Sequence, residues 1–319
     1  MISEAVPALY NRYVRISSER GDPSDPSGVL TSVYRYPIKS CRGHPMPVAV
    51  VEPWGLAGDR RWMVIDHTGE AITARQQPRL VLVTPESTET GLLLHAPGAE
   101  PLSVRPPAGQ ALPVSVFSNP LPGVLADQPA HAWFSALLGI PVRLVYLADP
   151  TQRRPSADYS QPTDRVMFAD GYPLLLTTEE SLAELNRLVL AQPDSDGRPL
   201  PMARFRPNLV VTGAPAWAED FWRRLRTGEA EFRAVKACPR CVLTTVDPET
   251  AARGKEPLRT LAQHRRWAGK TWFGMNLIPD TPGAKVRVGD PVEILESASV
   301  SERPDEGHQW GDGQDRTIG

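Results

Sequence analysis

The feature that most limits the fold is a succession of short strand patterns separated by turns. Between residues 29 and 117 we predict strands over six ranges, namely 29–36, 48–51, 61–65, 79–83, 92–95 and 112–117. Strands this short and closely spaced are typical of a barrel or a curled sheet. The 34 prolines fit many turns and argue against a helical bundle. The sequence therefore predicts a β-rich α+β fold.

Helices are few in this prediction, and their boundaries carry clear signals. Asp127 has the side chain of an N-cap, and Gly139 should end the helix that follows it. In the second half, residues 177–180 form a capping box before a helix, and another helix is expected at 258–267. Further strands are expected at 142–147, 174–176, 208–212, 231–236, 242–246 and 285–295.

The chain is long enough for two domains. A stretch rich in Pro, Arg and Ser after Asp149 is expected to join them. We expect five segments: a flexible N-terminal extension at 1–28, a β-barrel domain at 29–149, a linker at 150–163, a second domain at 164–296 and a disordered tail at 297–319.

Composition excludes several classes of function. The net charge of −2 gives no support for nucleic acid or an anionic membrane surface as a partner. Three cysteines are too few for a disulfide framework and fit a reducing compartment. No apolar run approaches the roughly 18 residues needed to cross a bilayer, and the N-terminus lacks the apolar core of a secretory signal. We therefore expect a soluble, cytoplasmic protein. Hydrolase, zincin and nucleotide-binding functions have no support, because the motifs G-x-S-x-G, H-E-x-x-H, P-loop and G-x-G-x-x-G are absent from the sequence.

Cys238 and Cys241 form a C-x-x-C motif, which is compatible with several chemistries. The β-branched run 242–246 predicts a strand, so Cys241 should lie at a strand edge. A thioredoxin-like dithiol would require the first cysteine at a helix N-terminus instead. A structural zinc site would require two more ligands, which no second motif in the sequence supplies. Two interpretations remain: a single cysteine ligand to a metal that an organic cofactor also holds, or a buried structural pair.

Three other short motifs carry groups suited to anions or heterocycles. Lys39 and Ser40 follow the first strand and could bind a phosphate. Arg60 precedes a strand and could bind an anion through two hydrogen bonds. Arg206 and Asn208 flank a proline and could contact the edge of a planar heterocycle. Taken alone, the first two motifs are better explained by solvated charges at strand ends, and the third has a capped turn as its alternative.

These motifs, in this order, resemble the MOSC superfamily, whose members are related to the C-terminal domain of molybdenum cofactor sulfurase. The resemblance covers about residues 29–295 and is closest to the branch of the mitochondrial amidoxime-reducing component and the bacterial YcbX-type proteins. It rests on five runs, YPIKS at 36–40, TARQQPRL at 73–80, FRPN at 205–208, ACPRCVLTTVDP at 237–248 and VGDPV at 288–292.

The resemblance implies an N-terminal MOSC β-barrel domain and a C-terminal MOSC β-barrel domain with flanking helices. A molybdenum cofactor (Mo-molybdopterin) would lie between them, with Cys241 as the metal ligand and a catalytic residue. The phosphate and pyran end of the cofactor would be held by Lys39, Ser40 and Arg60. Pterin contacts are implied for Asp170, Gly171, Tyr172, Arg206 and Asn208, and positions beside the metal for Pro239, Arg240 and Asn276. Arg240 would also orient the substrate or the cofactor phosphate, whereas Cys238 is given no catalytic role.

The function implied by the resemblance is reduction of small N-hydroxylated or N-oxygenated compounds. YcbX-type proteins carry a plant-type iron–sulfur domain, for which this chain has neither the length nor the cysteines. Electrons would therefore come from a separate ferredoxin-, flavin- or cytochrome-type protein. Two alternatives belong to other classes of function. One is a carrier of the cofactor, or of a persulfide on Cys241, without reductase turnover; the other is a cofactor-free interaction module.

Overall fold

A computed structural model describes residues 28–117 and 119–298 of the chain. Within these ranges the protein is rich in strands and has three α-helices, which confirms the predicted β-rich α+β class. None of the helices in these ranges is long and apolar enough to cross a membrane. The predicted N-terminal extension, apart from Gly28, and the predicted tail, apart from Ser297 and Ala298, lie outside the described residues.

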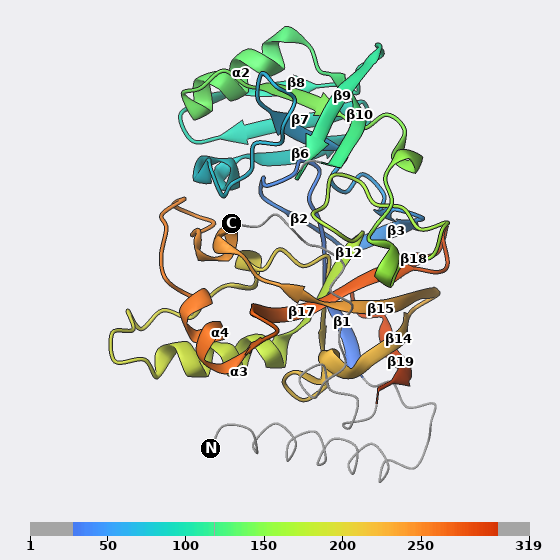
Figure 1. Cartoon of the computed structure of the whole chain (residues 1–319), viewed down its shortest axis with the longest axis vertical. Coiled ribbons are helices and arrows are strands. Elements are labelled where there is room, and N and C mark those ends of the chain that lie inside the picture. The colour runs from blue at the N-terminus through green and yellow to red at the C-terminus, as the bar shows by residue number, and fades with distance from the viewer. Residues whose placement is uncertain (1–27, 118, 299–319) are drawn as a thin grey trace.

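Seven strands of one sheet close into a barrel, in the lower half of Figure 1. Their order is β12 (Leu174–Thr178), β13 (Leu209–Thr212), β1 (Gly28–Arg35), β19 (Pro291–Ser297), β14 (Trp222–Thr227), β15 (Ala230–Pro239) and β17 (Lys270–Pro279). β17 then pairs with β12 and completes the barrel. Only β12 and β13 run parallel to each other. Apolar side chains of all seven strands fill the interior, among them those of Leu30, Leu176, Leu209, Leu225, Phe232, Leu277 and Val292.

The first described strand belongs to this barrel, although most barrel strands come from the second half of the chain. In β1, Val33 pairs with Leu209 of β13, and Val29 pairs with Pro291 of β19. A short strand, β2 (His44–Met46), also pairs with β1. The chain therefore leaves the barrel after β1 and returns to it with β12. The predicted domain limits, which place residue 29 in the first domain, stay a prediction.

The intervening residues form a second β-rich part, above the barrel in Figure 1. One sheet has the order β5 (Trp62–Ile65), β11 (Arg143–Tyr146), β10 (Asn119–Leu125) and β9 (Ala111–Val116), and another has the order β6 (Thr84–Thr88), β7 (Gly91–Ala96) and β8 (Ala99–Val104). Helix α2 (Gln128–Leu138) packs on them through Phe134. Its predicted ends are confirmed, since Asp127 accepts a hydrogen bond from Ala130 N and Gly139 adopts a left-handed φ of 70°.

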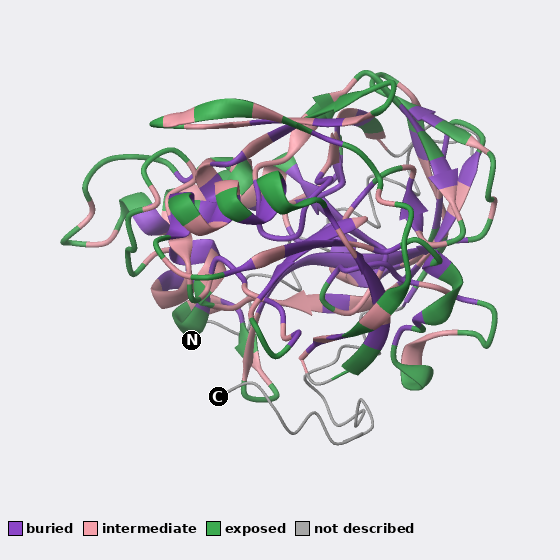
Figure 2. Cartoon of the chain, turned by 90° about the horizontal axis from the view of Figure 1, so that it is seen from above, coloured by how far each residue is buried: buried purple, intermediate pink, exposed green. Residues whose placement is uncertain are grey.

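Three smaller elements complete the fold. A short sheet joins β18 (Lys285–Arg287), β3 (Val48–Glu52) and β4 (Gly55–Leu56). Helix α3 (Glu179–Leu190) begins within the predicted box, but its N-cap is Thr178, whose side chain accepts a hydrogen bond from Ser181 N, and Glu180 accepts from Gly213 N instead of capping the helix. Helix α4 (Leu258–His264) ends earlier than predicted, because β16 (Arg266–Trp267) pairs with β17 instead of continuing the helix. Seen from above in Figure 2, the central strands are buried and the connecting loops are exposed.

Two predicted strands are wrong, because both segments form 3₁₀ helices. These are η1 (Pro78–Leu82) and η6 (Val242–Thr245). In η6, the hydroxyls of Thr244 and Thr245 donate to the carbonyls of Cys241 and Val242 at 2.9 and 2.8 Å. Such local bonds compete with strand pairing, so the β-branched composition did not decide the structure. Cys241 therefore precedes a helical turn and does not lie at a strand edge.

The strands that the sequence analysis also missed include β6, β8, β10, β14 and β17. Prolines obscure the pattern in β8 and β10, where they lie on strands of small sheets. Gly274 interrupts the apolar run of β17, where its φ is 79°. We expected Asn276 between a helix and the last strands. It lies instead within the missed strand β17, where it pairs with Leu175 and Lys236.

Candidate functional site

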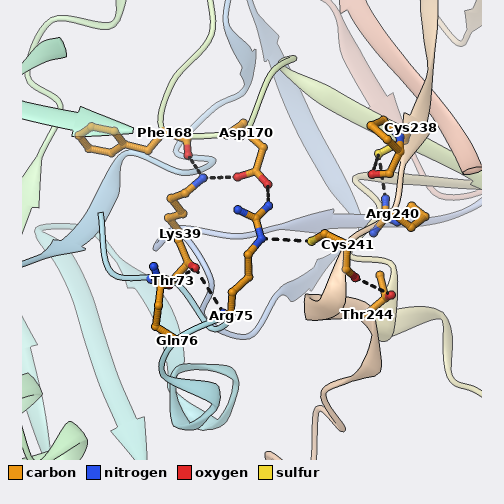
Figure 3. A network of polar contacts seen from close by, with 12 residues as sticks. Lys39, Thr73, Arg75, Gln76, Phe168, Asp170, Cys238, Arg240, Cys241 and Thr244 are labelled. Carbon is orange, nitrogen blue, oxygen red and sulfur yellow. Dashed lines mark hydrogen bonds and ion pairs between the residues drawn. The ribbon is translucent and has the colours of Figure 1, made fainter. Parts of the chain in front are cut away.

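Cys241 lies where residues from the two halves of the chain meet. It is half-buried and stands between the end of β15 and η6. Its sulfur accepts a hydrogen bond from Arg75 Nε at 3.2 Å (Figure 3). Arg75 precedes Cys241 by 166 residues and comes from the segment between β5 and η1. The contact places a positive charge directly against the sulfur.

The turn that carries Arg75 is fixed by its own polar contacts. The Thr73 carbonyl accepts from the backbone N–H groups of Gln76 and Gln77 at 3.0 and 2.9 Å. The Gln76 side chain accepts from Thr73 N at 3.0 Å. The guanidinium of Arg75 also lies over the Phe117 ring, 4.6 Å from its centre. The side chain of Arg75 is only 17% exposed, so this cation is held in place before any ligand arrives.

Asp170 connects Arg75 to a second cation, Lys39. Its Oδ2 accepts from Arg75 at 2.7 Å, and its Oδ1 pairs with Lys39 Nζ, which also donates to the Phe168 carbonyl at 2.8 Å (Figure 3). Burial lowers the pKa of Lys39 to about 8, although Asp170 opposes this shift. Crowding by protein atoms would raise the pKa of Asp170, but Lys39 and Arg75 hold it well below its usual range. The Asp170 side chain is nevertheless 54% exposed, so a ligand can reach it.

The backbone that presents Asp170 is held by Arg153. This side chain is buried and donates to three carbonyls, those of Met167 at 2.6 Å, Ala169, and Asp170 at 2.7 Å. Burial lowers the pKa of Arg153 to about 10, so it remains a cation at neutral pH. Gly171 and Tyr172 follow directly, and the Tyr172 ring meets that of Tyr159 edge-on, with 6.4 Å between centres. Arg153 thus fixes the loop on which three of the predicted site residues lie.

A second group of cations lies around Tyr36. The guanidinium groups of Arg60 and Arg206 lie over its ring, at 4.5 and 4.4 Å from the centre. Arg60 also donates to the Asn208 side chain at 3.0 Å, and Asn208 donates to the Tyr34 carbonyl at 3.1 Å. Asn208 and Arg60 therefore bind each other and β1.

Three of the residues predicted to bind a cofactor have unusual backbone conformations. Ser40, Arg60 and Arg206 have left-handed φ values of 68°, 44° and 57°. Phe117, under Arg75, has a φ of 50°. Residues other than glycine rarely adopt this conformation, and such positions cluster at functional sites. Their concentration here marks the region around Lys39 and Tyr36 as specialised.

On the other side of Cys241, Arg240 binds the first cysteine of the motif. Its guanidinium donates to Cys238 Sγ at 2.9 Å and to the Phe205 carbonyl at 2.8 Å. Burial raises the pKa of the Cys238 thiol, against the influence of Arg240. Each cysteine thus has its own arginine, and the two sulfurs have different surroundings. Pro239 lies at the end of β15, opposite Trp272, and the Asn276 side chain is 3.5 Å from the Ala237 carbonyl.

Comparison with known proteins identifies the family. The model of the MOSC N-terminal beta barrel domain matches residues 27–141, and that of the MOSC domain matches residues 163–293. Over 288 residues the chain is 34% identical to mitochondrial amidoxime-reducing component 1 of Homo sapiens, which covers 84% of this chain and 83% of the relative. The chain belongs to the MOSC family.

Other relatives of this MOSC protein carry similar names. It is 36% identical over 288 residues to mitochondrial amidoxime reducing component 2 of Rattus norvegicus, covering 83% of this chain and 82% of the relative. Among solved structures, the YUAD protein from Bacillus subtilis covers 83% of this chain and 93% of its own at 11% identity. Its TM-score of 0.37 is too low to bear on the fold.

The structure brings the predicted residues of the MOSC protein together in three groups. Lys39 and Asp170 share the Arg75 network with Cys241, and Gly171 and Tyr172 directly follow Asp170. Arg60 and Arg206 lie over Tyr36, Asn208 binds Arg60, and Ser40 directly follows Lys39. Arg240 binds Cys238, while Asn276 contacts the Ala237 carbonyl and Pro239 ends β15. The sequence analysis missed Arg75 and Arg153 as site residues. Arg75 stands in the run 73–80 that carried the resemblance, so its signal was present. Arg153 lies in the predicted linker and had no signal of its own.

The chemistry of these side chains suits an anionic, sulfur-bound cofactor. Five cations, Lys39, Arg60, Arg75, Arg206 and Arg240, approach the region, whereas the acids that contact them are Asp59 and Asp170. Arg240 Nε is buried without a hydrogen-bond partner in the described part of the chain. Nowhere in that part do three His, Cys, Asp or Glu side chains group as a metal site would require. One thiolate beside several cations fits a metal whose other ligands come from a phosphate-bearing cofactor.

Proposed function

We propose that the protein binds one molybdenum cofactor through Cys241 and reduces N-hydroxylated compounds with electrons from a separate protein. The observation that carries this proposal is the position of Cys241. This half-buried cysteine has its sulfur against the cation of Arg75, whose network includes a second cation, Lys39. The relatives named amidoxime-reducing components support the substrate class.

The overall reaction follows from the substrate class. An N-hydroxy group, C=N–OH or N–OH, accepts two electrons and two protons, the N–O bond breaks, and C=N–H or N–H and one water leave. When bound, the molybdenum cofactor supplies the two-electron chemistry and the site for the departing oxygen. The protein must therefore bind the cofactor, orient it and admit both substrate and electrons.

Each group of residues contributes one part of this work. Cys241 would be the only protein ligand of the metal. Arg75 would hold the Cys241 sulfur in position and offset the negative charge of the thiolate. Lys39, Ser40 and Arg60 would hold the phosphate and pyran end of the cofactor. Asp170 to Tyr172, with Arg206 and Asn208, would contact the pterin. Arg240, fixed between Cys238 and Phe205, would orient the substrate or the phosphate.

The remaining parts of the proposal concern the setting of the reaction. The electron donor would be a ferredoxin-, flavin- or cytochrome-type protein, and the substrate a small N-oxygenated compound. We place the protein in the cytoplasm, as its cysteine content suggests.

The test compares wild type with Cys241→Ser, and with Cys238→Ser as a matched control three residues away in the same motif. Each protein is purified from a host that makes molybdenum cofactor, and molybdenum content and benzamidoxime reduction with reduced methyl viologen are measured. We expect near-stoichiometric molybdenum and turnover in wild type and Cys238→Ser, and loss of turnover in Cys241→Ser. Molybdenum without turnover in wild type would indicate a carrier instead, and wild type without molybdenum would refute the proposal.

A further inference from the structure

The segment that begins beside Cys241 is more basic than the chain as a whole. Residues 240–270 contain seven of the 35 Lys and Arg residues but only three of the 37 Asp and Glu residues, in a chain whose net charge is −2. Each of the three acids has an arginine partner: Asp247 pairs with Arg204, Glu249 with Arg42, and Glu256 with Arg259. The excess positive charge is therefore not cancelled within the segment.

Three exposed cations of this segment, Arg253, Lys255 and Arg266, form what we call the basic rim. In the described part of the chain none of the three has an acidic side chain within ion-pair distance. Their charges are therefore available to a partner.

The basic rim is tied to the site by backbone and side-chain contacts. Arg253 donates to the carbonyl of Arg75, whose guanidinium contacts Cys241. Gly254, the residue before Lys255, donates from its backbone N–H to Thr245 in η6 at 3.0 Å. Arg266 pairs with Thr271, whose carbonyl accepts from Arg240 N at 2.8 Å. The three cations thus come from segments that flank Cys241 on two sides.

An exposed apolar residue lies next to Cys241 in the same segment. Val242 follows Cys241 directly and is 41% exposed, one of six large apolar side chains that are open to solvent in the described residues. A small apolar contact surrounded by charge is the form that transient protein interfaces take. Charged rims chiefly accelerate association and select the partner.

We infer that the basic rim and Val242 form the docking surface for an acidic electron-transfer protein. This inference rests on the proposed reductase function, which needs electrons from outside the chain. Electron transfer weakens steeply with distance, so the donor must dock close to Cys241, and this surface is adjacent to it. The charge of the rim selects a donor with an acidic face. An anionic membrane would satisfy the charge but would supply no electrons to a cofactor bound at Cys241.

The test uses charge reversal with a matched control. Lys255→Glu/Arg266→Glu reverses two charges of the rim, and neither residue contacts the Arg75 network. Lys285→Glu/Arg287→Glu makes the same change in β18, which lies on the opposite side of the molecule in Figure 1. Holoenzyme of each is assayed for reduction of benzamidoxime with two donors, reduced methyl viologen and an acidic plant-type ferredoxin. Equilibrium binding of the ferredoxin is measured separately.

We expect the rim variant to lose about tenfold or more in ferredoxin-driven rate and in ferredoxin binding at low ionic strength, because steering by charge is strong there. Its viologen-driven rate should equal that of wild type, and the β18 variant should match wild type in all assays. Raising the salt concentration should remove most of the difference between the proteins.

Equal ferredoxin binding by all three proteins would overturn the docking surface. It would also be overturned if Lys255 and Arg266 were needed to bind anionic phospholipid vesicles but not to bind ferredoxin. Absence of viologen-driven turnover in wild type would refute the reductase proposal instead. In that case the binding measurement still decides whether the rim recognises an acidic protein.

Discussion

Replacement of Arg153 by methionine should destabilise the protein and loosen the loop that presents Asp170. The buried guanidinium donates to the carbonyls of Met167, Ala169 and Asp170. A hydrogen bond from a charged donor contributes about 1.5–3 kcal/mol, and the methionine leaves three carbonyls without this partner. Desolvation of the cation, which the variant no longer suffers, offsets part of this sum. We expect a net loss of about 3 kcal/mol in the free energy of unfolding.

The measurement is thermal and urea unfolding of Arg153→Met beside Arg154→Met. Arg154 is the neighbouring arginine and is exposed, so its replacement should change stability by at most about 0.5 kcal/mol. For a protein of this size, 3 kcal/mol corresponds to a fall of roughly 5–10 °C in Tm. Equal Tm values for the two variants would refute the reasoning, since they would show that the three carbonyl contacts contribute nothing.

Three further predictions follow from the same contacts. Arg75→Met should lower molybdenum retention during dialysis several-fold, with Arg75→Lys intermediate, because the cation against Cys241 is lost; metal analysis before and after dialysis checks this. Burial raises the pKa of Glu219 from 4.5 to about 7, so the folded protein binds this proton more tightly than the unfolded chain does. Its contribution to stability is therefore complete below about pH 4.5 and is lost as the pH rises through 7, by up to about 3 kcal/mol. Glu219→Gln should flatten the dependence of the urea unfolding midpoint on pH between 5 and 8. An unchanged slope would exclude Glu219 as the source of this dependence. Gly274→Ala should lower the free energy of unfolding by at least about 2 kcal/mol more than Gly269→Ala does. A Cβ at Gly274 would lie 2.7 Å from the Leu176 carbonyl where the barrel closes, whereas Gly269 has a similar φ and open space around it. Similar urea unfolding midpoints for the two variants would contradict this.

The sequence predicted helix ends well where the deciding contacts join residues close together in the chain. The caps at Asp127, Gly139 and Thr178 act within four residues, so the sequence alone located those helix ends. At η1 and η6 the local signals instead predicted the wrong element, a strand in place of a 3₁₀ helix. There the apolar, β-branched residues pack into a core through a helical turn, which composition does not distinguish from a strand.

Contacts distant in sequence were beyond such reasoning. β1 joins the barrel by pairing with residues near 210 and 291, and no pattern within 28–35 specifies these partners. The same holds for the site, where the hydrogen bond from Arg75 to Cys241 joins residues 166 positions apart. The resemblance could relate the motifs to one another, but only the fold shows which side chains touch. Arg153 illustrates the limit, since its role depends on a loop that folds back over it.

The central claim is that Cys241 is the only protein ligand of a molybdenum cofactor. Molybdenum X-ray absorption spectroscopy tests it most directly, by counting sulfur ligands in wild type, Cys241→Ser and Cys238→Ser. The account predicts one sulfur fewer around molybdenum in Cys241→Ser than in wild type, and no change in Cys238→Ser. The same number of sulfur ligands in wild type and Cys241→Ser, or a loss in Cys238→Ser, would contradict it.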